Sequence, residues 1–186
     1  MTEVADPGAE ELRTRLLAKV RDVPDFPNPG IVFKDVTPLL ADPAAFAAAV
    51  EGLAAPYRDA PPDKVAGIEA RGFIFGAPVS RLLDVGFVPV RKKGKLPGDV
   101  VAASYDLEYG SATIEVTADA FAVGERVLVV DDVLATGGTA AATVELVRQC
   151  GAEVVGIAVL MELGFLQGRD ALRAVHAPEP HVLAVV

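Results

Sequence analysis

The stretch from Val127 to Ala140, VLVVDDVLATGGTA, constrains the fold more than any other part of the chain. It opens with four apolar, mostly β-branched residues, which are typical of a strand buried on both faces of a parallel sheet. Two adjacent aspartates end that run, and a glycine-containing turn follows them. The sequence from Ala140 to Cys150 then has a helix-forming composition. The pattern predicts a strand, a turn and a helix of an α/β fold.

The turn itself, Thr136 to Thr139, has the features of a phosphate site. In a parallel α/β sheet the ligand crevice lies outside the carboxyl ends of the strands, where this turn would lie. Glycines let the backbone approach a ligand closely, and the free N–H groups at a helix start favour an anion. Asp131 and Asp132 come one step earlier, and carboxylates accept hydrogen bonds, so a vicinal diol is their natural partner. A phosphate cradle beside acceptors for a diol predicts a ribose 5-phosphate.

Simpler interpretations of this stretch stay open on the residues alone. Many strand-turn-helix units carry glycine with no ligand, and two acidic residues can simply cap a helix. The position of the paired aspartates directly after a buried strand favours the ligand. Two other phosphate motifs are absent, because the stretch lacks the lysine of a P-loop and the spacing of G-x-G-x-x-G.

Length and charge limit the remaining possibilities. The chain has 186 residues, enough for one domain with a substantial core, and 52% of them are hydrophobic. Its formal net charge of −9 argues against a nucleic-acid or anionic-membrane partner. No signal peptide or apolar run of membrane-spanning length is evident, so we expect a cytoplasmic protein. The single cysteine, Cys150, leaves no intrachain disulfide and argues against a zinc cluster.

Predicted strands alternate with predicted helices through the middle of the chain. This alternation predicts a mostly parallel central sheet flanked by helices, with a β-hairpin inserted near residues 101–116. The predicted strands are 64–69, 86–92, 101–105, 112–116, 127–130, 153–160 and 181–186. The predicted helices are 9–20, 43–56, 75–84, 140–150 and 167–174. Residues 1–35 do not fit the alternation, so we expect a tail, a helix and a small N-terminal hood there, and a single core over residues 36–186.

Three further loops are candidates for the same crevice. Arg71, within the segment Glu69 to Gly72 at a strand end, supplies a cation for a second phosphate. Taken without the other motifs, it is better interpreted as a surface arginine in an ordinary strand-helix turn. The segment Arg91 to Lys95 has four cations in five residues, which is either a solvated charge run or a mobile binding loop. Glu108 and Tyr109 lie at a hairpin tip, where a glutamate on a flexible loop could close over a site and accept a proton.

Several segments in order resemble the adenine phosphoribosyltransferases of the type I phosphoribosyltransferase family. The VVDD and TGGT element is similar to the phosphoribosyl-diphosphate (PRPP) signature of the whole family. The segments that resemble the adenine branch are DFPNPGIVFKDVTPLL from Asp25, GIEARGFIFG from Gly67, VPVRKKGKLPG from Val88 and SYDLEYG from Ser104. The likeness covers nearly the whole chain from about Val20 onward.

The resemblance implies a glycosyltransferase, specifically a pentosyltransferase, of purine salvage. Such an enzyme transfers the phosphoribosyl group of PRPP to adenine and gives AMP and pyrophosphate. The resemblance also implies Mg²⁺ held mainly by PRPP rather than by protein ligands, small-molecule substrates only, and a homodimer. Neither a nucleic acid nor a membrane is implied as a partner.

Residue roles follow from the matched motifs alone. The 5-phosphate would be bound by Ala135, Thr136, Gly137, Gly138 and Thr139, and the ribose hydroxyls by Asp131 and Asp132. Pyrophosphate would be bound by Arg71 with Arg91, Lys92 and Lys95, the loop coming from either subunit. Adenine would contact Val32, Phe33, Lys34 and Leu163, with Lys34 using its backbone, since many relatives have arginine there. Glu108 would be the acid/base residue, next to the substrate-binding Tyr109, with Arg71 and Lys95 as further catalytic residues.

Competing functions belong to three classes. A phosphoribosyltransferase for another purine base would share most of these motifs. A regulatory protein could keep the PRPP site as a sensor, but such proteins usually add a DNA-binding segment, for which this chain has no basic region. A purely structural α/β module would leave the paired aspartates unexplained.

Overall fold

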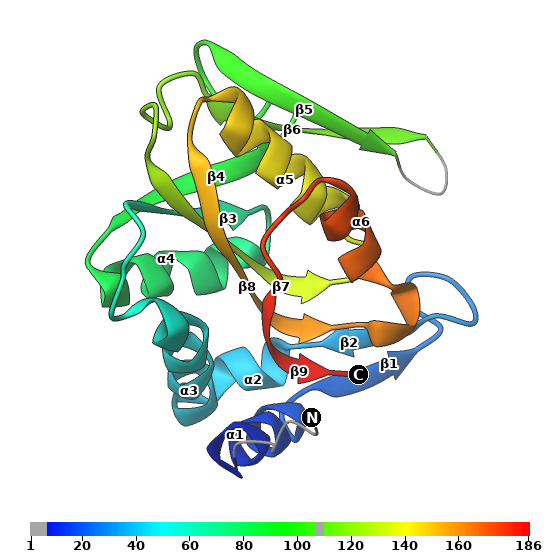
Figure 1. Cartoon of the computed structure of the whole chain (residues 1–186). Helices are drawn as coiled ribbons and strands as arrows, with labels where there is room; N and C mark the ends of the chain where they lie inside the picture. Colours follow the sequence, from blue (N-terminus) through cyan, green and yellow to red (C-terminus); the bar gives the residue numbers. More distant parts are fainter. Residues whose placement is uncertain (1–6, 107–109) are drawn as a thin grey trace. The chain divides into compact units, whose positions relative to one another are not determined.

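The computed structural model describes residues 7–106 and 110–186 (Figure 1). The chain divides into two compact units, Met1–Gly52 and Leu53–Val186. The division after residue 35 into hood and core, which the sequence predicts, stays a prediction. Within the described residues, no helix is long and apolar enough to cross a membrane.

A seven-stranded sheet forms the centre of the second unit, as far as the described residues show. Its order is β5-β6-β4-β3-β7-β8-β9. The pairs β3·β4, β3·β7, β7·β8 and β8·β9 are parallel, while β4·β6 and β5·β6 are antiparallel. The bounds are β3 Lys64–Ile68, β4 Gly86–Lys92, β5 Val100–Asp106, β6 Ser111–Thr117, β7 Arg126–Leu134, β8 Glu153–Glu162 and β9 His181–Val185. The predicted mostly parallel sheet is confirmed.

The strand order reverses between β3 and β7. From β3 the chain passes through helix α4 (Gly72–Leu83) to β4 on one side, and from β7 it passes through α5 (Gly138–Gln149) to β8 on the other. Because both crossovers are expected to be right-handed, opposite directions put the two helices on opposite faces of the sheet. Figure 1 shows α4 and α5 in this arrangement. A ligand crevice is therefore expected outside the carboxyl ends of β3 and β7.

The strand predicted to be buried on both faces forms the middle of the core. Val127, Leu128, Val129 and Val130 are all 0% exposed. Fully burying a Val or Leu side chain contributes about 1.5–3 kcal/mol, so these four fix β7 firmly in the sheet. The strand continues past the predicted end to Leu134, because its last residues pair with β8, Asp131 with Val159 and Leu134 with Glu162. Tertiary pairing thus overrides the break that two charged residues suggested.

Helix boundaries differ from the prediction at several starts. Helix α4 begins at Gly72 instead of residue 75, and α5 begins at Gly138 instead of residue 140. In both cases the first residue of the helix is a glycine, and a prediction from composition assigns glycine to a turn. Helix α6 (Gly168–Ala174) agrees with the prediction, and two short 3₁₀ segments were not predicted, Ala55–Tyr57 and Gly164–Leu166.

The first unit contains helix α1 (Pro7–Leu17), a hairpin of β1 (Arg21–Pro24) and β2 (Val32–Asp35), and helix α2 (Thr37–Ala41). Helix α3 (Pro43–Ala54) begins there too. Oδ1 of Asp42 accepts the amides of Ala44 and Ala45, both at 3.0 Å, and so caps the amino end of this helix. The hairpin strands and α2 were not predicted, because four- and five-residue elements beside prolines carry almost no periodic signal.

Candidate active site

The turn after β7 encloses a small pocket at the start of α5. The pocket has a volume of about 70 Å³ and is lined by Asp131, Val133 and every residue from Leu134 to Ala140. Pockets that enclose a drug-sized molecule usually measure about 300–1,000 Å³, so this one suits a single group of a ligand. The run that lines it contains all five residues predicted to bind a 5-phosphate.

Backbone amides supply the positive potential of this pocket. The first amides of α5, those of Gly138, Thr139 and Ala140, have no hydrogen-bond acceptor in residues 7–106 and 110–186, whereas the amide of Ala141 bonds Gly137 O at 2.9 Å. Unpaired amides at the start of a helix of twelve residues attract anions, both through the N–H groups and through the helix dipole. The predicted phosphate cradle therefore has the local geometry that an anion requires.

The shape of the turn depends on glycine at two positions. Gly137 has φ +82°, and a Cβ added there would lie 2.2 Å from Gly168 O. A Cβ added at Gly168 would in turn lie 2.3 Å from Ala135 O. The start of α6 thus presses backbone to backbone against the phosphate turn. Sequence reasoning missed Gly168, whose contact depends on tertiary packing.

Asp131 lines this pocket, and Asp132 follows it on β7. Asp131 is half-buried, and its Oδ1 accepts the amide of Asp132 at 2.9 Å. Desolvation of its carboxylate, together with the charge of Asp132, raises the pKa of Asp131 well above its ordinary value. Asp132 is 5% exposed, and its Oδ2 accepts Nε of Arg71 at 2.5 Å. Two carboxylates and one guanidinium thus share a small volume.

The loop between β3 and α4 packs directly on these aspartates. A Cβ added at Gly72 would lie 2.8 Å from Oδ1 of Asp131 and 2.9 Å from Val130 O. Gly72 is therefore required for the close approach of α4 to β7. The structure brings Arg71 and both aspartates together at the switch point, as the sequence predicts for strand ends in one parallel sheet. The Glu69–Ala70 peptide in this loop is cis.

The lysine-rich segment also meets the end of β3. Arg91 Nε lies 3.3 Å from Oε2 of Glu69, and Lys95 Nζ bonds Oε1 of Glu69. The amides of Lys92 and Gly94 bond Glu69 and Glu115, each at 2.9 Å. Neither glutamate was singled out from the sequence. The predicted topology did indicate the contact with Glu69. The carboxyl ends of β3 and β4 lie at the same edge of a parallel sheet, and Glu69 follows β3 while the cations follow from the end of β4.

The predicted acid/base residue cannot be placed. Glu108 and Tyr109 lie outside the described residues, between the ends of β5 and β6. The hairpin does contact the phosphate turn nearby, because Thr139 Oγ1 and the hydroxyl of Tyr105 are 2.9 Å apart. Tyr105 is on β5, three residues before Glu108, and sequence reasoning gave it no role.

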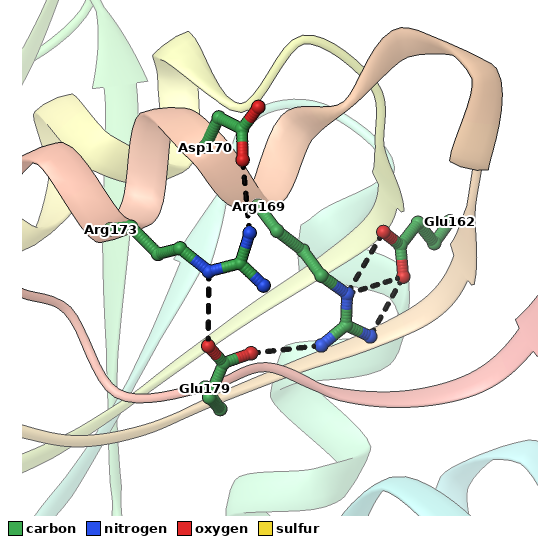
Figure 2. A network of polar contacts seen from close by, with 5 residues as sticks. All are labelled: Glu162, Arg169, Asp170, Arg173 and Glu179. Carbon is green, nitrogen blue, oxygen red and sulfur yellow. Dashed lines mark hydrogen bonds and ion pairs between the residues drawn. The ribbon is translucent and has the colours of Figure 1, made fainter.

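A network of ion pairs begins at Glu162, the residue before Leu163, which is predicted to face adenine. Figure 2 shows the five residues of this network. Glu162, at the end of β8, is 5% exposed and accepts Nε and Nη2 of Arg169 at 2.8–3.0 Å. Arg169 also bonds Glu179 at 3.0 Å, and Arg173 joins Glu179 to Asp170. The network fixes α6 to the end of β8. It thereby supports both the half-buried Leu163 and the phosphate turn that α6 presses against.

The other residues predicted to line the adenine site belong to the first unit. Val32, Phe33 and Lys34 are on β2, and Nζ of Lys34 bonds Asp22 of the paired strand at 2.7 Å. That ion pair engages the side chain, which is consistent with a backbone role for Lys34. Because these residues and Leu163 belong to different units, their meeting at one base stays a prediction.

A turn of unpaired amides at a sheet switch point, with acidic acceptors beside it, is the arrangement expected of an α/β protein that binds a sugar phosphate. The family described as "Phosphoribosyl transferase domain" matches residues 38–175. An adenine phosphoribosyltransferase of a Nocardioides species is 65% identical over 163 residues, covering 86% of this chain and 88% of the relative. The chain belongs to the phosphoribosyltransferase family, and within it to the adenine phosphoribosyltransferases.

Solved structures agree with this placement. The crystal structure of adenine phosphoribosyltransferase from Rhodothermus marinus has a TM-score of 0.89 and 52% identity, covering 95% of this chain and 99% of that one. The Saccharomyces cerevisiae enzyme, complexed with adenine and D-2,5-dideoxy-2,5-imino-altritol 1,6-bisphosphate, has a TM-score of 0.84 and 38% identity, covering 93% and 97%. The predicted fold and family are thereby confirmed, and the protein is a pentosyltransferase.

Proposed function

We propose that this chain transfers the phosphoribosyl group of PRPP to adenine, releasing pyrophosphate and AMP, with the β7–α5 turn as its phosphate site. The observation that carries the proposal is the set of unpaired amides of Gly138, Thr139 and Ala140 beside Asp131. The names of the relatives support adenine as the base. The enzyme would serve purine salvage.

Binding of PRPP uses the two parts of this site for different groups. The 5-phosphate occupies the cradle of residues 135–139, where amides and the hydroxyls of Thr136 and Thr139 donate to its oxygens. The ribose hydroxyls donate to Asp131 and Asp132, whose carboxylates act only as acceptors when they are ionised. The raised pKa of Asp131 means that a bound hydroxyl compensates a carboxylate that is otherwise poorly solvated.

Displacement at the anomeric carbon breaks the bond to pyrophosphate and forms a bond to a purine nitrogen. Such glycosyl transfers pass through an oxocarbenium-like state, in which negative charge develops on the leaving group. Arg71, Arg91 and Lys95 are already held at the strand ends, and together with Lys92 they stabilise that charge as it grows. Adenine gives up a proton as it attacks, and Glu108 accepts it.

A magnesium ion fits the residues present, provided that PRPP supplies most of its ligands. No group of three or more metal-ligating side chains occurs in residues 7–106 and 110–186. Mg²⁺ commonly binds through one or two carboxylates together with substrate phosphates and water. The phosphate and ribose oxygens of PRPP, together with water, would hold it near Asp131 and Asp132. When bound, the ion supplies positive charge that neutralises the pyrophosphate.

Two further properties complete the proposal: the enzyme works in the cytoplasm, and it does so as a homodimer, in keeping with the family resemblance. Ile74 and Leu82, both on α4, are 41% and 36% exposed and offer apolar surface to a second copy. Light scattering after size-exclusion chromatography measures the mass directly. A monomer at micromolar concentration would refute the dimer.

Product analysis tests the activity. The protein is mixed with PRPP, Mg²⁺ and one of adenine, hypoxanthine, guanine or xanthine, and the nucleotides are separated by chromatography. We expect AMP from adenine and no comparable product from the others. A product from another base alone would identify a different purine enzyme, and PRPP binding without any product would identify a sensor.

A further inference from the structure

The loop after β3 puts a carboxylate inside a site for a polyanion. Glu69 immediately follows β3, lies two residues before Arg71, and has a side chain that is only 9% exposed. On its own, such a charge opposes the binding of pyrophosphate. We propose that Glu69 is a positioning residue, which holds Arg91 and Lys95 in the arrangement that receives the pyrophosphate group of PRPP. The inference rests on the proposed role of those two cations.

Both oxygens of Glu69 are engaged by the cationic loop. Oε2 accepts Nε of Arg91 at 3.3 Å and the amide of Lys92 at 2.9 Å, while Oε1 accepts Nζ of Lys95. The amide of Glu69 itself donates to Val90 O at 2.9 Å, which fastens this residue to β4. The side chain of Glu69 therefore links the end of β3 to three residues of the segment Arg91 to Lys95.

Apart from Glu69, one contact within the described residues fixes a cationic side chain of this loop, because Arg91 Nη1 donates to Lys95 O at 3.3 Å. Residues 92–95 are exposed, and Gly94 and Gly98, with φ +78° and +76°, have open space where a Cβ would be. Glu115 and Thr113 hold the backbone, through the amides of Gly94 and Lys93. In the described part of the chain, Glu69 is the carboxylate that contacts cationic side chains of this loop. The ammonium of Lys95 therefore depends on Glu69 for its position, and the guanidinium of Arg91 depends on Glu69 together with the carbonyl of Lys95.

The physical benefit is preorganisation. Arg91 and Lys95 repel each other, and a carboxylate between them offsets that repulsion while it fixes both groups. Burial alone would raise the pKa of Glu69, but the bonds from Lys95, Lys92 and Arg91 outweigh it and lower the pKa to about 2. Glu69 is therefore ionised at neutral pH. Cations that are fixed beforehand need no reorganisation as charge develops on a leaving group.

The test is the variant Glu69→Gln, which keeps the size and an acceptor for the Lys92 amide but removes the charge. We expect the KM for PRPP to rise about tenfold, the KM for adenine to stay unchanged, and the melting temperature to fall no further than in the control variant described below. If Glu69 acted only as an unfavourable charge, the variant would bind PRPP more tightly. A lower or unchanged KM for PRPP would overturn the inference.

A matched control is Glu125→Gln. Glu125 also accepts a lysine and a backbone amide, Lys64 Nζ and Ala122 N, each at 2.8 Å, but it precedes the amino end of β7. This control should lose some stability without a change in the KM for PRPP. If both variants raise that KM in proportion to lost stability, the role of Glu69 is structural and the inference fails.

A double-mutant cycle with Lys95→Met separates the positioning role of Glu69 from the pyrophosphate-binding role of the loop. If Glu69 acts through Lys95, the effect of Glu69→Gln on the KM for PRPP shrinks in the Lys95→Met background. Full additivity would overturn the positioning role while leaving the loop assignment intact. If Lys95→Met and Arg91→Ala each leave the KM for PRPP unchanged, the proposed function of the loop is itself refuted, and the inference falls with it.

Discussion

Replacing Gly137 by alanine adds one methyl group at the point where the phosphate turn meets α6. Gly137 has φ +82°, and the new Cβ would lie 2.2 Å from Gly168 O, 2.9 Å from Ala171 Cβ and 3.0 Å from Gly168 C. Two of these three neighbours are backbone atoms, so no side-chain rotation relieves the contact. Either the turn or the start of α6 must move by about 1 Å to restore van der Waals separation.

The magnitude has two parts. A left-handed conformation costs a residue with a Cβ about 1–2 kcal/mol, and overpacking in a tight region costs about 1–3 kcal/mol. We therefore expect Gly137→Ala to lower the free energy of unfolding by about 2–5 kcal/mol, which most domains survive. A displacement of about 1 Å also breaks amide–phosphate hydrogen bonds, which tolerate only a few tenths of an ångström. Loss of two such charge-assisted bonds weakens PRPP binding by about 100-fold or more.

Gly124→Ala is the matched control. Gly124 has φ +81°, and a Cβ there would meet nothing within 4 Å. It lies before the amino end of β7, whereas Gly137 follows the carboxyl end. The control carries the same conformational cost without the steric one, so we expect about 1–2 kcal/mol of destabilisation and unchanged PRPP affinity.

Urea denaturation measures the stability of both variants, and titration calorimetry with PRPP measures their affinities below the melting transition. The comparison isolates the effect of the close contact with α6. Wild-type PRPP affinity in folded Gly137→Ala would refute the reasoning, because the phosphate would then not depend on the backbone shape of the turn.

Three other variants test separate parts of the site. The pKa of Asp131 is raised in the folded protein, so its ionised form destabilises the fold above its ordinary pKa. Asp131→Asn should therefore raise the free energy of unfolding at pH 7, measured by urea denaturation, and weaken PRPP binding, measured by calorimetry. A lower free energy of unfolding in this variant would contradict the expected direction of the effect. Glu108→Ala should lower kcat by about 100-fold or more and leave the Kd for PRPP nearly unchanged, whereas a wild-type turnover number would remove Glu108 from the mechanism. For Glu69, the folded-state pKa of about 2 lies below the ordinary 4.5, so its contribution to stability is complete well above pH 4.5 and disappears as pH falls toward 2. The stability difference between wild type and Glu69→Gln should accordingly shrink between pH 5 and pH 2.5 in urea denaturation; a constant difference would show that the ion pairs do not stabilise the fold.

Strands with strong local patterns were predictable. Strand β4 begins and ends where the sequence predicts, Gly86–Lys92, because an apolar run lies between a glycine and a cluster of cations. The hairpin β1·β2 was missed, since its strands have four residues each and Pro24 sits in one of them. Short exposed strands carry neither a periodic nor a compositional signal. Their existence is decided by pairing with each other.

The same distinction applies to the site. Residues that would touch ligand were found by their chemistry, because paired aspartates and a glycine-containing turn are unusual after a buried strand. Residues that hold the site together were missed, namely Glu69, Glu115 and Gly168. Each contacts the site across a gap in sequence that only the fold closes, as between Gly168 and Gly137. A lone glutamate or glycine has no local feature that reveals such a contact.

Electrostatics explain why this arrangement suits an acidic protein. With a net charge of −9, the chain as a whole repels PRPP, so attraction must come from fixed local groups. The amides at the start of α5 provide partial charges that need no counterion. Arg71 is held by Asp132, and Arg91 and Lys95 are held by Glu69, so full charges are kept in place without leaving cations to repel one another. A carboxylate beside each cation lowers the attraction for any passing anion, and only a ligand that engages the amides, the aspartates and the cations together compensates for that loss. The acidic residues in the crevice therefore favour selectivity for PRPP over simple phosphate.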